Sequence, residues 1–336
     1  MIKGLSRLFI RTFIFCSISA IVMIAGAFMW FNHLWQTPLM QSEDRLLLIA
    51  SGTNHNQLAS QLYDEGYLPE LWYYPAFRFG FSLVEEASFS PKAGEFEVPA
   101  GATYAKLFSI IDEGVPYQHR IAIIEGTTAR DIVVALNKEK RMAGAILRVP
   151  DEGTLAPDTY FFVRGTQRAD MIDRMQRRQE IILAEEWANR SRAVSYQSAQ
   201  QALIMASIVE KETALIREQP LVASVFLNRI KADMRLQSDA TVLYGIIEEE
   251  GRHREVLSKD LKEDSPWNSY TRKGYPKTPI GNPSRGAIRA ALNPLPSTYF
   301  YFVADGQGGH KFAKTYPEHQ KNVAAYRRLR AAQKNK

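Results

Sequence analysis

One stretch decides how the C-terminal half of the chain folds, and it reads Ala199-Gln200-Gln201-Ala202-Leu203-Ile204-Met205-Ala206-Ser207-Ile208-Val209-Glu210-Lys211-Glu212-Thr213. Its mostly apolar run, free of glycine and proline, predicts a buried α-helix that ends in two glutamates. A buried carboxylate costs several kcal/mol unless it is paired or neutralised. The stretch therefore predicts either a core helix whose polar end reaches solvent or a helix that presents a catalytic acid with a raised pKa.

The two glutamates differ in the helix face that they occupy. Successive residues of an α-helix are rotated by about 100°, so Glu210 and Glu212 point to nearly opposite sides and form no dyad. Glu212 shares its face with apolar residues, whereas the face of Glu210 includes the hydroxyl of Ser207. Loss of hydration raises the pKa of a carboxyl group, and a general acid must be protonated near neutral pH. We therefore expect Glu212 to be the acid, with Glu210 as a structural neighbour and the reserve candidate.

Polar and aromatic side chains are concentrated in the loops that follow this helix. Amides and hydroxyls make the directional hydrogen bonds that sugar hydroxyls need, and aromatic rings stack on pyranose faces. Each loop alone is more typical of a simple turn, but three such loops after a helix that ends in glutamate favour a carbohydrate cleft. The side chains expected to bind substrate are Gln237, Ser238, Asp239, Asn268, Tyr270 and Asn282.

Other catalytic chemistries lack their residues in this sequence. The chain contains neither G-x-S-x-G nor H-E-x-x-H, and its single cysteine, Cys16, lies in the apolar N-terminal segment. His310 and His319 have no evident third ligand, so we expect surface histidines there, and no metal ion or cofactor.

The charge balance says little about partners. The 336 residues carry a formal net charge of +6, but the basic residues are spread along the chain and cluster only in the tail, residues 327–336. A solvated basic helix end explains that cluster better than nucleic-acid binding does. We expect no nucleic-acid partner.

The N-terminus predicts a membrane anchor. The segment 12–31 has no charged residue and is long enough to cross a bilayer. Basic residues precede it, and Trp30 and Trp35 lie at its far end, where aromatic rings favour the membrane interface. The positive-inside rule places the N-terminus in the cytoplasm and the rest of the chain outside it. The alternative is a cleaved signal peptide with its site near Ala25-Gly26-Ala27.

The middle of the chain repeats one local pattern three times. Beginning near residues 46, 96 and 121, a short apolar strand leads to a glycine turn and then to an amphipathic helix. Such small units look like the peptidoglycan-binding LysM type, although a purely structural repeat explains the pattern equally well.

Helices and loops dominate the remainder of the chain. Further helices are predicted at 171–188, 220–232 and 319–333, a loop-rich region at 235–296, and a buried strand at 299–303. We expect an α+β protein in three parts: an anchor at 1–35, a LysM-like region at 36–150, and a mainly helical, loop-rich catalytic domain at 151–336.

Several short motifs occur together in the second half of the chain. They are Glu152-Gly153, Pro157-Asp158-Thr159-Tyr160, Ala206-Ser207-Ile208-Val209-Glu210-Lys211-Glu212-Thr213, Asn228-Arg229, Leu236-Gln237-Ser238-Asp239, Asn268-Ser269-Tyr270, Pro279-Ile280-Gly281-Asn282-Pro283 and Tyr301-Phe302-Val303-Ala304-Asp305-Gly306. This combination resembles the MltG/YceG-like endolytic murein transglycosylases, and the resemblance extends from the anchor to the last helix. The chain departs from the expected pattern at Ala240 and Trp267, where proline and tyrosine are expected.

The resemblance implies a single-pass enzyme of the inner membrane, with its LysM-like region and catalytic domain in the periplasm. Such an enzyme cuts nascent peptidoglycan strands internally between N-acetylmuramic acid and N-acetylglucosamine. It leaves 1,6-anhydro ends and acts as a terminase of elongation, with cell-wall synthases as implied partners. The helix end also resembles that of soluble lytic transglycosylases, in which a hydroxyl residue follows the catalytic glutamate, and this register selects Glu212.

Two other classes of function stay open on the sequence alone. A hydrolytic muramidase would use Asp239 as a second carboxylate to activate water. A non-catalytic scaffold would bind glycan strands through its repeats and cleave nothing.

Overall fold

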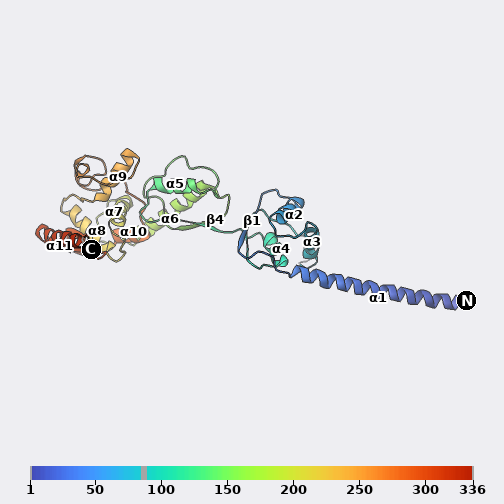
Figure 1. Cartoon of the computed structure of the whole chain (residues 1–336). Coiled ribbons are helices and arrows are strands. Elements are labelled where there is room, and N and C mark those ends of the chain that lie inside the picture. The colour runs from blue at the N-terminus through green and yellow to red at the C-terminus, as the bar shows by residue number, and fades with distance from the viewer. Residues whose placement is uncertain (1, 85–88, 335–336) are drawn as a thin grey trace. The chain divides into compact units, whose positions relative to one another are not determined.

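The computed structural model describes residues 2–84 and 89–334, which form two compact units, Met1–His119 (unit 1) and Arg120–Lys336 (unit 2). Met1 and Lys336, at the ends of the predicted anchor and basic tail, lie outside the described residues. Figure 1 shows the elements, which are α1 (Ile2–Trp35), β1 (Arg45–Ile49), α2 (His55–Asp64), α3 (Tyr73–Val84), β2 (Gly94–Val98), α4 (Tyr104–Glu113), β3 (His119–Ala122), α5 (Ala129–Lys138), β4 (Thr159–Phe162), α6 (Arg168–Ala188), α7 (Ala199–Glu212), α8 (Gln219–Lys231), α9 (Asp239–Glu250), η1 (Asp260–Lys262), α10 (Arg285–Leu292), β5 (Tyr301–Ala304), β6 (His310–Ala313) and α11 (Tyr316–Lys334).

Unit 1 is built on the antiparallel pair β1–β2, in which Leu47 lies opposite Phe96. Alternation along β1 turns Leu47 and Ile49 inward, where they pack with the buried faces of α2, α3 and α4. Trp35, at the end of α1, is only 5% exposed and belongs to the same core. The end of α1 is therefore a structural part of unit 1.

The three predicted strand–glycine–helix repeats are confirmed as local structure. Gly52, Gly101 and Gly126 turn the chain with φ of 81°, 69° and 74°, which glycine adopts readily. A polar side chain caps each following helix: Asn54 before α2, Thr103 before α4 and Thr128 before α5. The third repeat, however, packs with unit 2, because Ile132 and Leu136 of α5 lie in one core with β4 and α6.

Unit 2 therefore begins at Arg120, earlier than the boundary near residue 150 that the sequence predicted. A second core in this unit surrounds α7, which packs against α10, α8 and α6. The strands of the described residues form three two-stranded sheets, β1–β2, β3–β4 and β5–β6. This mixture of helices and small sheets confirms the α+β class.

The predicted loop-rich region 235–296 contains two helices that the sequence reading missed. The helix α9 begins directly after Ser238, and α10 begins after Ser284, whose hydroxyl accepts a hydrogen bond from the amide of Ala287. Frequent prolines in this region favoured the prediction of loops over helices. The helix α3 was missed as well. The helix predicted at 171–188, which the sequence indicates as exposed because it is rich in Arg, Gln and Glu, buries one face. The strand β5, predicted to be buried, is half-buried and pairs with β6.

The helix α1 is long and apolar enough to cross a membrane. Its segment Ile10–Trp35 has a mean hydropathy of 2.2, and none of its most apolar window is buried against the protein. Length and composition are thus compatible with a single-pass anchor.

Candidate active site

The helix α7 carries both candidate glutamates into the second core of unit 2. It begins after Ser198, whose hydroxyl accepts a hydrogen bond from the amide of Gln201. All residues 202–209 are buried, Ser207 on the Glu210 face included. Burial of the helix body therefore does not by itself separate the two faces. The two carboxylates differ in the partners that meet them at the end of the helix.

Glu212 is partly buried and lies among polar groups of three other segments. Burial raises the pKa of this carboxyl group, and the negative charge of Asp239 raises it further. The hydroxyl of Ser238 donates a hydrogen bond of 2.5 Å to Oε1, and the positive charges of His310 and Arg229 also act to lower the pKa. Among the residues that the structure describes, no hydrogen bond reaches Oε2. Glu212 thus combines a raised pKa with one free carboxyl oxygen.

A cluster of hydroxyls fixes Ser238 at the start of α9. Its amide donates to Oγ of Ser269 at 3.0 Å, and its carbonyl accepts from Oγ1 of Thr241 at 2.7 Å. The hydroxyls of Thr241 and Ser269 are 2.8 Å apart and hydrogen-bonded to each other. Ser238 itself is only 2% exposed. Its hydroxyl is therefore held in place before any ligand binds.

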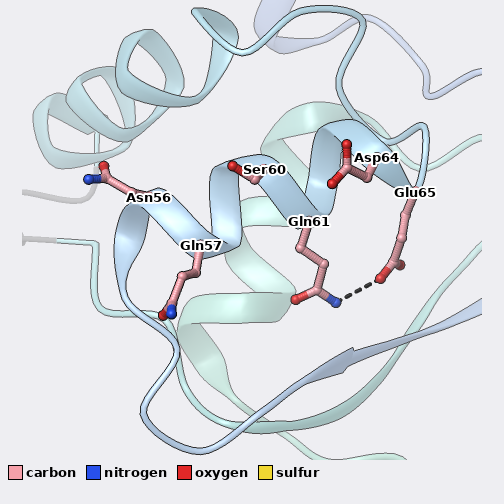
Figure 2. A pocket seen from close by; sticks show the side chains of 6 residues that line it. All are labelled: Asn56, Gln57, Ser60, Gln61, Asp64 and Glu65. Carbon is pink, nitrogen blue, oxygen red and sulfur yellow. Dashed lines mark hydrogen bonds between the residues drawn. The ribbon is translucent and has the colours of Figure 1, made fainter.

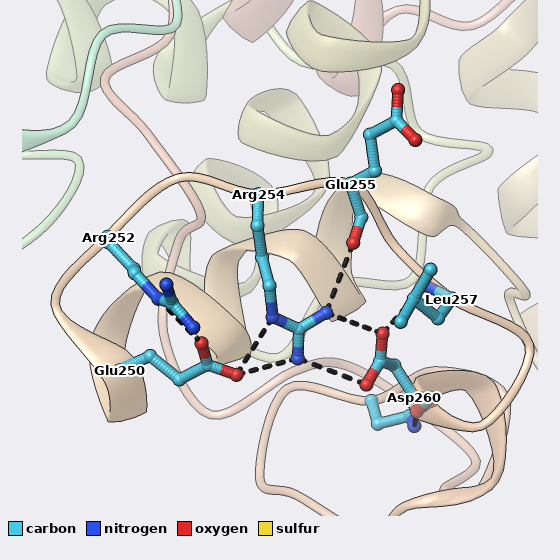
Figure 3. A network of polar contacts seen from close by, with 7 residues as sticks. Glu250, Arg252, Arg254, Glu255, Leu257 and Asp260 are labelled. Carbon is cyan, nitrogen blue, oxygen red and sulfur yellow. Dashed lines mark hydrogen bonds and ion pairs between the residues drawn. The ribbon is translucent and has the colours of Figure 1, made fainter.

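A polar network supports the loop that supplies Ser269. Asn268 is 1% exposed, and its amide donates to the carbonyls of Asp260 and Glu263 at 3.0 and 2.6 Å. Figure 3 shows how Arg254 joins Asp260 to Glu250 at the end of α9. The chain of contacts therefore runs from a surface ion-pair network to the hydroxyls around Glu212.

Tyr270 and Asp239 lie on the open side of the same site. The hydroxyl of Tyr270 donates a hydrogen bond of 2.5 Å to Asp239, and both side chains are accessible to solvent. Burial and the neighbouring charges of Asp239 and Glu212 raise the pKa of Tyr270, so this phenol stays neutral near pH 7. These two residues are placed where a bound sugar could contact them.

The other three predicted binding residues occupy different positions. Gln237 is exposed and has a φ of 52°, and its amide donates to the carbonyl of Ser269. The side-chain amide of Asn268 donates hydrogen bonds to backbone carbonyls of its own loop. Asn282 is fully buried, donates to the carbonyl of Thr127 and to Glu152, and accepts from the amide of Leu155. Asn268 and Asn282 therefore have all their side-chain groups committed within the protein.

Glu210 belongs to a structural junction. Its Oε2 accepts a 2.7 Å hydrogen bond from the amide of Ser284, at the N-terminus of α10, and Nε2 of Gln219 lies 3.4 Å from its Oε1. A carboxylate at a helix N-terminus is favourable because the free amides and the helix dipole attract it. Both carboxyl oxygens of Glu210 thus link the end of α7 to the N-termini of α10 and α8.

Two cationic side chains near Glu212 were undervalued in the sequence reading. Arg229 is 7% exposed and donates to the carbonyls of Phe300 and Leu236 at 2.7 and 2.5 Å. His310, predicted to be a surface loop histidine, is instead the first residue of β6, and its Nδ1 is 2.7 Å from Oε2 of Glu218. Only the approach of α8 and β6 in three dimensions brings these charges to Glu212. His319 lies on α11, stacked on Tyr301.

Glu152 is a second carboxyl group with a raised pKa. Burial raises the pKa of Glu152 to about 7, although hydrogen bonds act in the opposite direction. Its oxygens accept from the amide of Ala129 at 3.0 Å, from Asn282 at 2.9 Å and from the hydroxyl of Tyr244 at 3.2 Å. The sequence marked Glu152 only as part of a motif and assigned it no role.

Several hollows mark the surface. A cavity of about 840 Å³ in unit 2 is lined by arginines of α6 and by the start of α10, next to the Glu210 junction. Figure 2 shows a polar hollow of about 580 Å³ along α2 of unit 1, with Gln61 hydrogen-bonded to Glu65. Within residues 2–84 and 89–334, no group of three or more His, Cys, Asp or Glu side chains is arranged to hold a metal ion.

Comparison of the amino-acid sequence with known proteins identifies a family. The sequence model of the YceG-like family matches residues 47–325. An endolytic murein transglycosylase of Bacillus subtilis (strain 168) is 36% identical over 181 residues, which are 54% of this chain and 49% of that protein. An endolytic murein transglycosylase of Streptococcus pneumoniae serotype 2 is 34% identical over 179 residues, 52% of this chain and 32% of that protein. The match thus spans half or less of the length of these relatives.

One solved structure can also be aligned with the chain. The crystal structure of a yceG-like protein from Listeria monocytogenes aligns with a TM-score of 0.49 and 27% identity, covering 84% of this chain and 99% of that chain. Because the family match covers well over half of the sequence, the chain belongs to the YceG-like family.

Proposed function

We propose that this protein is a membrane-anchored endolytic lytic transglycosylase that cleaves peptidoglycan strands. The observation that carries the proposal is Glu212, a carboxyl group with a raised pKa and one free oxygen, surrounded by polar groups that could hold a sugar. The curated relatives are named endolytic murein transglycosylases, which agrees with this chemistry.

In the proposed first step, protonated Glu212 donates its proton to the oxygen that links N-acetylmuramic acid to the next sugar. The bond between C1 and that oxygen breaks, and an oxocarbenium-like centre forms at C1. The hydrogen bond from Ser238 to Oε1 leaves Oε2 to carry the proton, since an oxygen that accepts is poorly placed to donate. Ser238 therefore acts as a positioning residue.

In the second step the same glutamate acts as a base. Ionised Glu212 takes the proton of the C6 hydroxyl, whose oxygen attacks C1 and closes a 1,6-anhydro ring. No water is consumed, so no second carboxylate has to activate one. The positive charge of Arg229 helps to stabilise the carboxylate between the two steps.

The remaining parts of the proposal concern the setting of the reaction. Residues 1–35 would anchor the chain in the inner membrane with the N-terminus in the cytoplasm, and both compact units would lie in the periplasm. There the enzyme would act on nascent strands beside the cell-wall synthases and end their elongation. The repeats of unit 1 would bind glycan in the manner of LysM modules.

The test is digestion of purified sacculi with the full chain in detergent, followed by mass spectrometry of the products. Wild type should release muropeptides with 1,6-anhydro ends, which are one water lighter than hydrolysed ones. Glu212→Gln should release no detectable amount in the same digestion time, and Glu210→Gln tests the reserve candidate. Glu249→Gln, which changes an exposed glutamate of α9, is the matched control.

Each other outcome points to a different protein. Anhydro products from Glu212→Gln would remove this residue from the mechanism. Reducing-end products from wild type would identify a muramidase, and Asp239, close to Glu212, would be its second carboxylate. Binding of sacculi without any product would identify a scaffold.

A further inference from the structure

The end of α1 is locked against α3. Phe31 stacks on Trp35 with ring centroids 5.9 Å apart and packs edge-on against Phe77 of α3 at the same distance. Gly80 of α3 lies directly against the ring of Phe31, where a Cβ atom would collide. The last turns of α1 therefore cannot swing freely relative to α3.

Large apolar side chains remain exposed on the outer side of this junction. Trp30 of α1 stacks on Trp72, which precedes α3, with centroids 6.1 Å apart and an interplanar angle of 11°. The two rings are nevertheless 55% and 45% exposed. Leu71, next to Trp72 in the sequence, is 50% exposed, and Phe79, seven residues after Trp72 on α3, is 68% exposed. Adjacent large apolar groups on a surface mark an interaction site. The patch formed by Trp30, Leu71, Trp72 and Phe79 is called the aromatic collar below.

The position of Trp30 along α1 indicates that a lipid bilayer contacts the aromatic collar. A hydrocarbon core of about 30 Å is spanned by about 20 helical residues, so an anchor that enters near residue 12 leaves near Trp30. The stacking contact then brings Trp72 to the depth of Trp30, at the headgroup level where tryptophan is enriched.

We infer that the aromatic collar inserts into the outer interface of the bilayer, so that unit 1 is seated on the membrane rather than carried on a free tether. This inference rests on the proposed membrane anchor. Phe79 and Leu71 dip toward the acyl chains, Trp30 and Trp72 lie at the headgroups, and the polar hollow of α2 faces water. Unit 1 is thereby held at the membrane surface, where newly made strands emerge.

The experiment measures membrane depth at single sites of the full chain. In a Cys16→Ser background, Phe79→Cys or Leu71→Cys is labelled with an environment-sensitive fluorophore and reconstituted into vesicles of phosphatidylethanolamine and phosphatidylglycerol. Lipids with a spin label near the headgroup or deep in the acyl chain then quench the fluorophore. Val22→Cys on α1 reports the anchor, and Ser60→Cys on the polar hollow is the control within unit 1.

The shallow spin label should quench positions 79 and 71 several-fold more than position 60, while the deep label quenches position 22 best. Equal, weak quenching at 79, 71 and 60 beside strong quenching at 22 would overturn the collar and leave the anchor standing. A blue-shifted, unquenched label at 79 would likewise overturn it, because a protein partner or a second copy would then cover the patch. Absence of quenching at 22 would overturn the anchor itself, and the collar with it.

Discussion

Glu212 and Glu152 are two buried carboxyl groups of unit 2 whose pKa values are both raised, and for both burial is the main cause. Their surroundings are nevertheless opposite. Glu152 has both oxygens engaged, by backbone amides, by Asn282 and by Tyr244. Glu212 accepts one hydrogen bond, from Ser238, and keeps Oε2 free within the described part of the chain.

The comparison teaches that a raised pKa alone does not identify a catalytic acid. A general acid must also reach the atom that receives its proton, which requires an unoccupied carboxyl oxygen. Glu152 instead ties the start of α5 to the loop of Asn282 and to α9 through Tyr244. We therefore propose that Glu212 transfers protons, whereas Glu152 holds segments of unit 2 together.

The largest expected effect is on the rate of product release, which should differ between substitutions of Glu212 and of Glu152. Glu212→Gln removes the transferable proton and should lower the rate of anhydro-product release by about 10²–10⁴-fold. Glu152→Gln keeps a side chain of the same shape, and its amide can donate to Tyr244, so the rate should stay within about threefold of wild type. Initial rates on sacculi measure both variants. A loss at Glu152→Gln as large as that at Glu212→Gln would contradict the division of roles.

The second expected effect is on the pH dependence of stability, to which the buried Glu152 should contribute. The pKa of Glu152 is raised from 4.5 to about 7 in the folded protein, so its contribution is fully present below 4.5 and is lost as pH rises through 7. The loss corresponds to about 3 kcal/mol at most. Glu152→Gln cannot ionise, so this variant should lose less stability than wild type between pH 5 and 8 (about the range of this titration).

Thermal unfolding of the full chain across that pH range measures the effect. Glu249→Gln, which changes an exposed carboxylate of α9, is the control and should follow wild type. Parallel pH profiles for wild type and Glu152→Gln would show that Glu152 has an ordinary pKa in the folded protein.

Most of the local structure follows from patterns that act over a few residues. Periodicity and backbone preference predict the helix Ala199–Glu212, the long apolar helix α1, and the glycine turns at Gly52, Gly101 and Gly126. The selection of Glu212 rested on the composition of its helix face, whereas the hydrogen bonds and charges that meet each carboxylate come from tertiary contacts.

The rest depends on contacts between segments distant in the sequence. Asn282 and Glu152 are 130 residues apart and meet only after folding. The same holds for His310 near Glu212, and for the grouping of the third repeat with unit 2, because the core shared by α5 and α6 has no local signal. The sequence alone does not distinguish an asparagine that binds a ligand from one that stabilises a loop, and Asn268 and Asn282 are of the second kind.

The third effect concerns the single hydrogen bond that Glu212 accepts. The hydroxyl of Ser238 stabilises the ionised carboxylate and lowers its pKa, so Ser238→Ala should raise the pKa of Glu212 further. The basic limb of the pH–rate profile should then move to higher pH, with about a tenfold lower maximum rate. Ser238→Thr, which restores a hydroxyl, should recover most of both properties. A lower rate with an unmoved basic limb would make Ser238 merely structural.

The smallest effect should come from the ion-pair network in Figure 3, which braces the loop before Asn268. Arg254 joins Glu250 to Asp260, whereas Arg252 contacts Glu250 alone, so the two arginines form a matched pair. Arg254→Met should loosen the loop that supplies Ser269 and lower the rate by less than about tenfold, because small displacements of positioning groups reduce catalysis. The pH–rate profile should keep its shape, since Ser238 still donates to Glu212. Arg252→Met should leave the rate unchanged, and an equal loss in both variants would show that surface charge, not the brace, matters to the reaction.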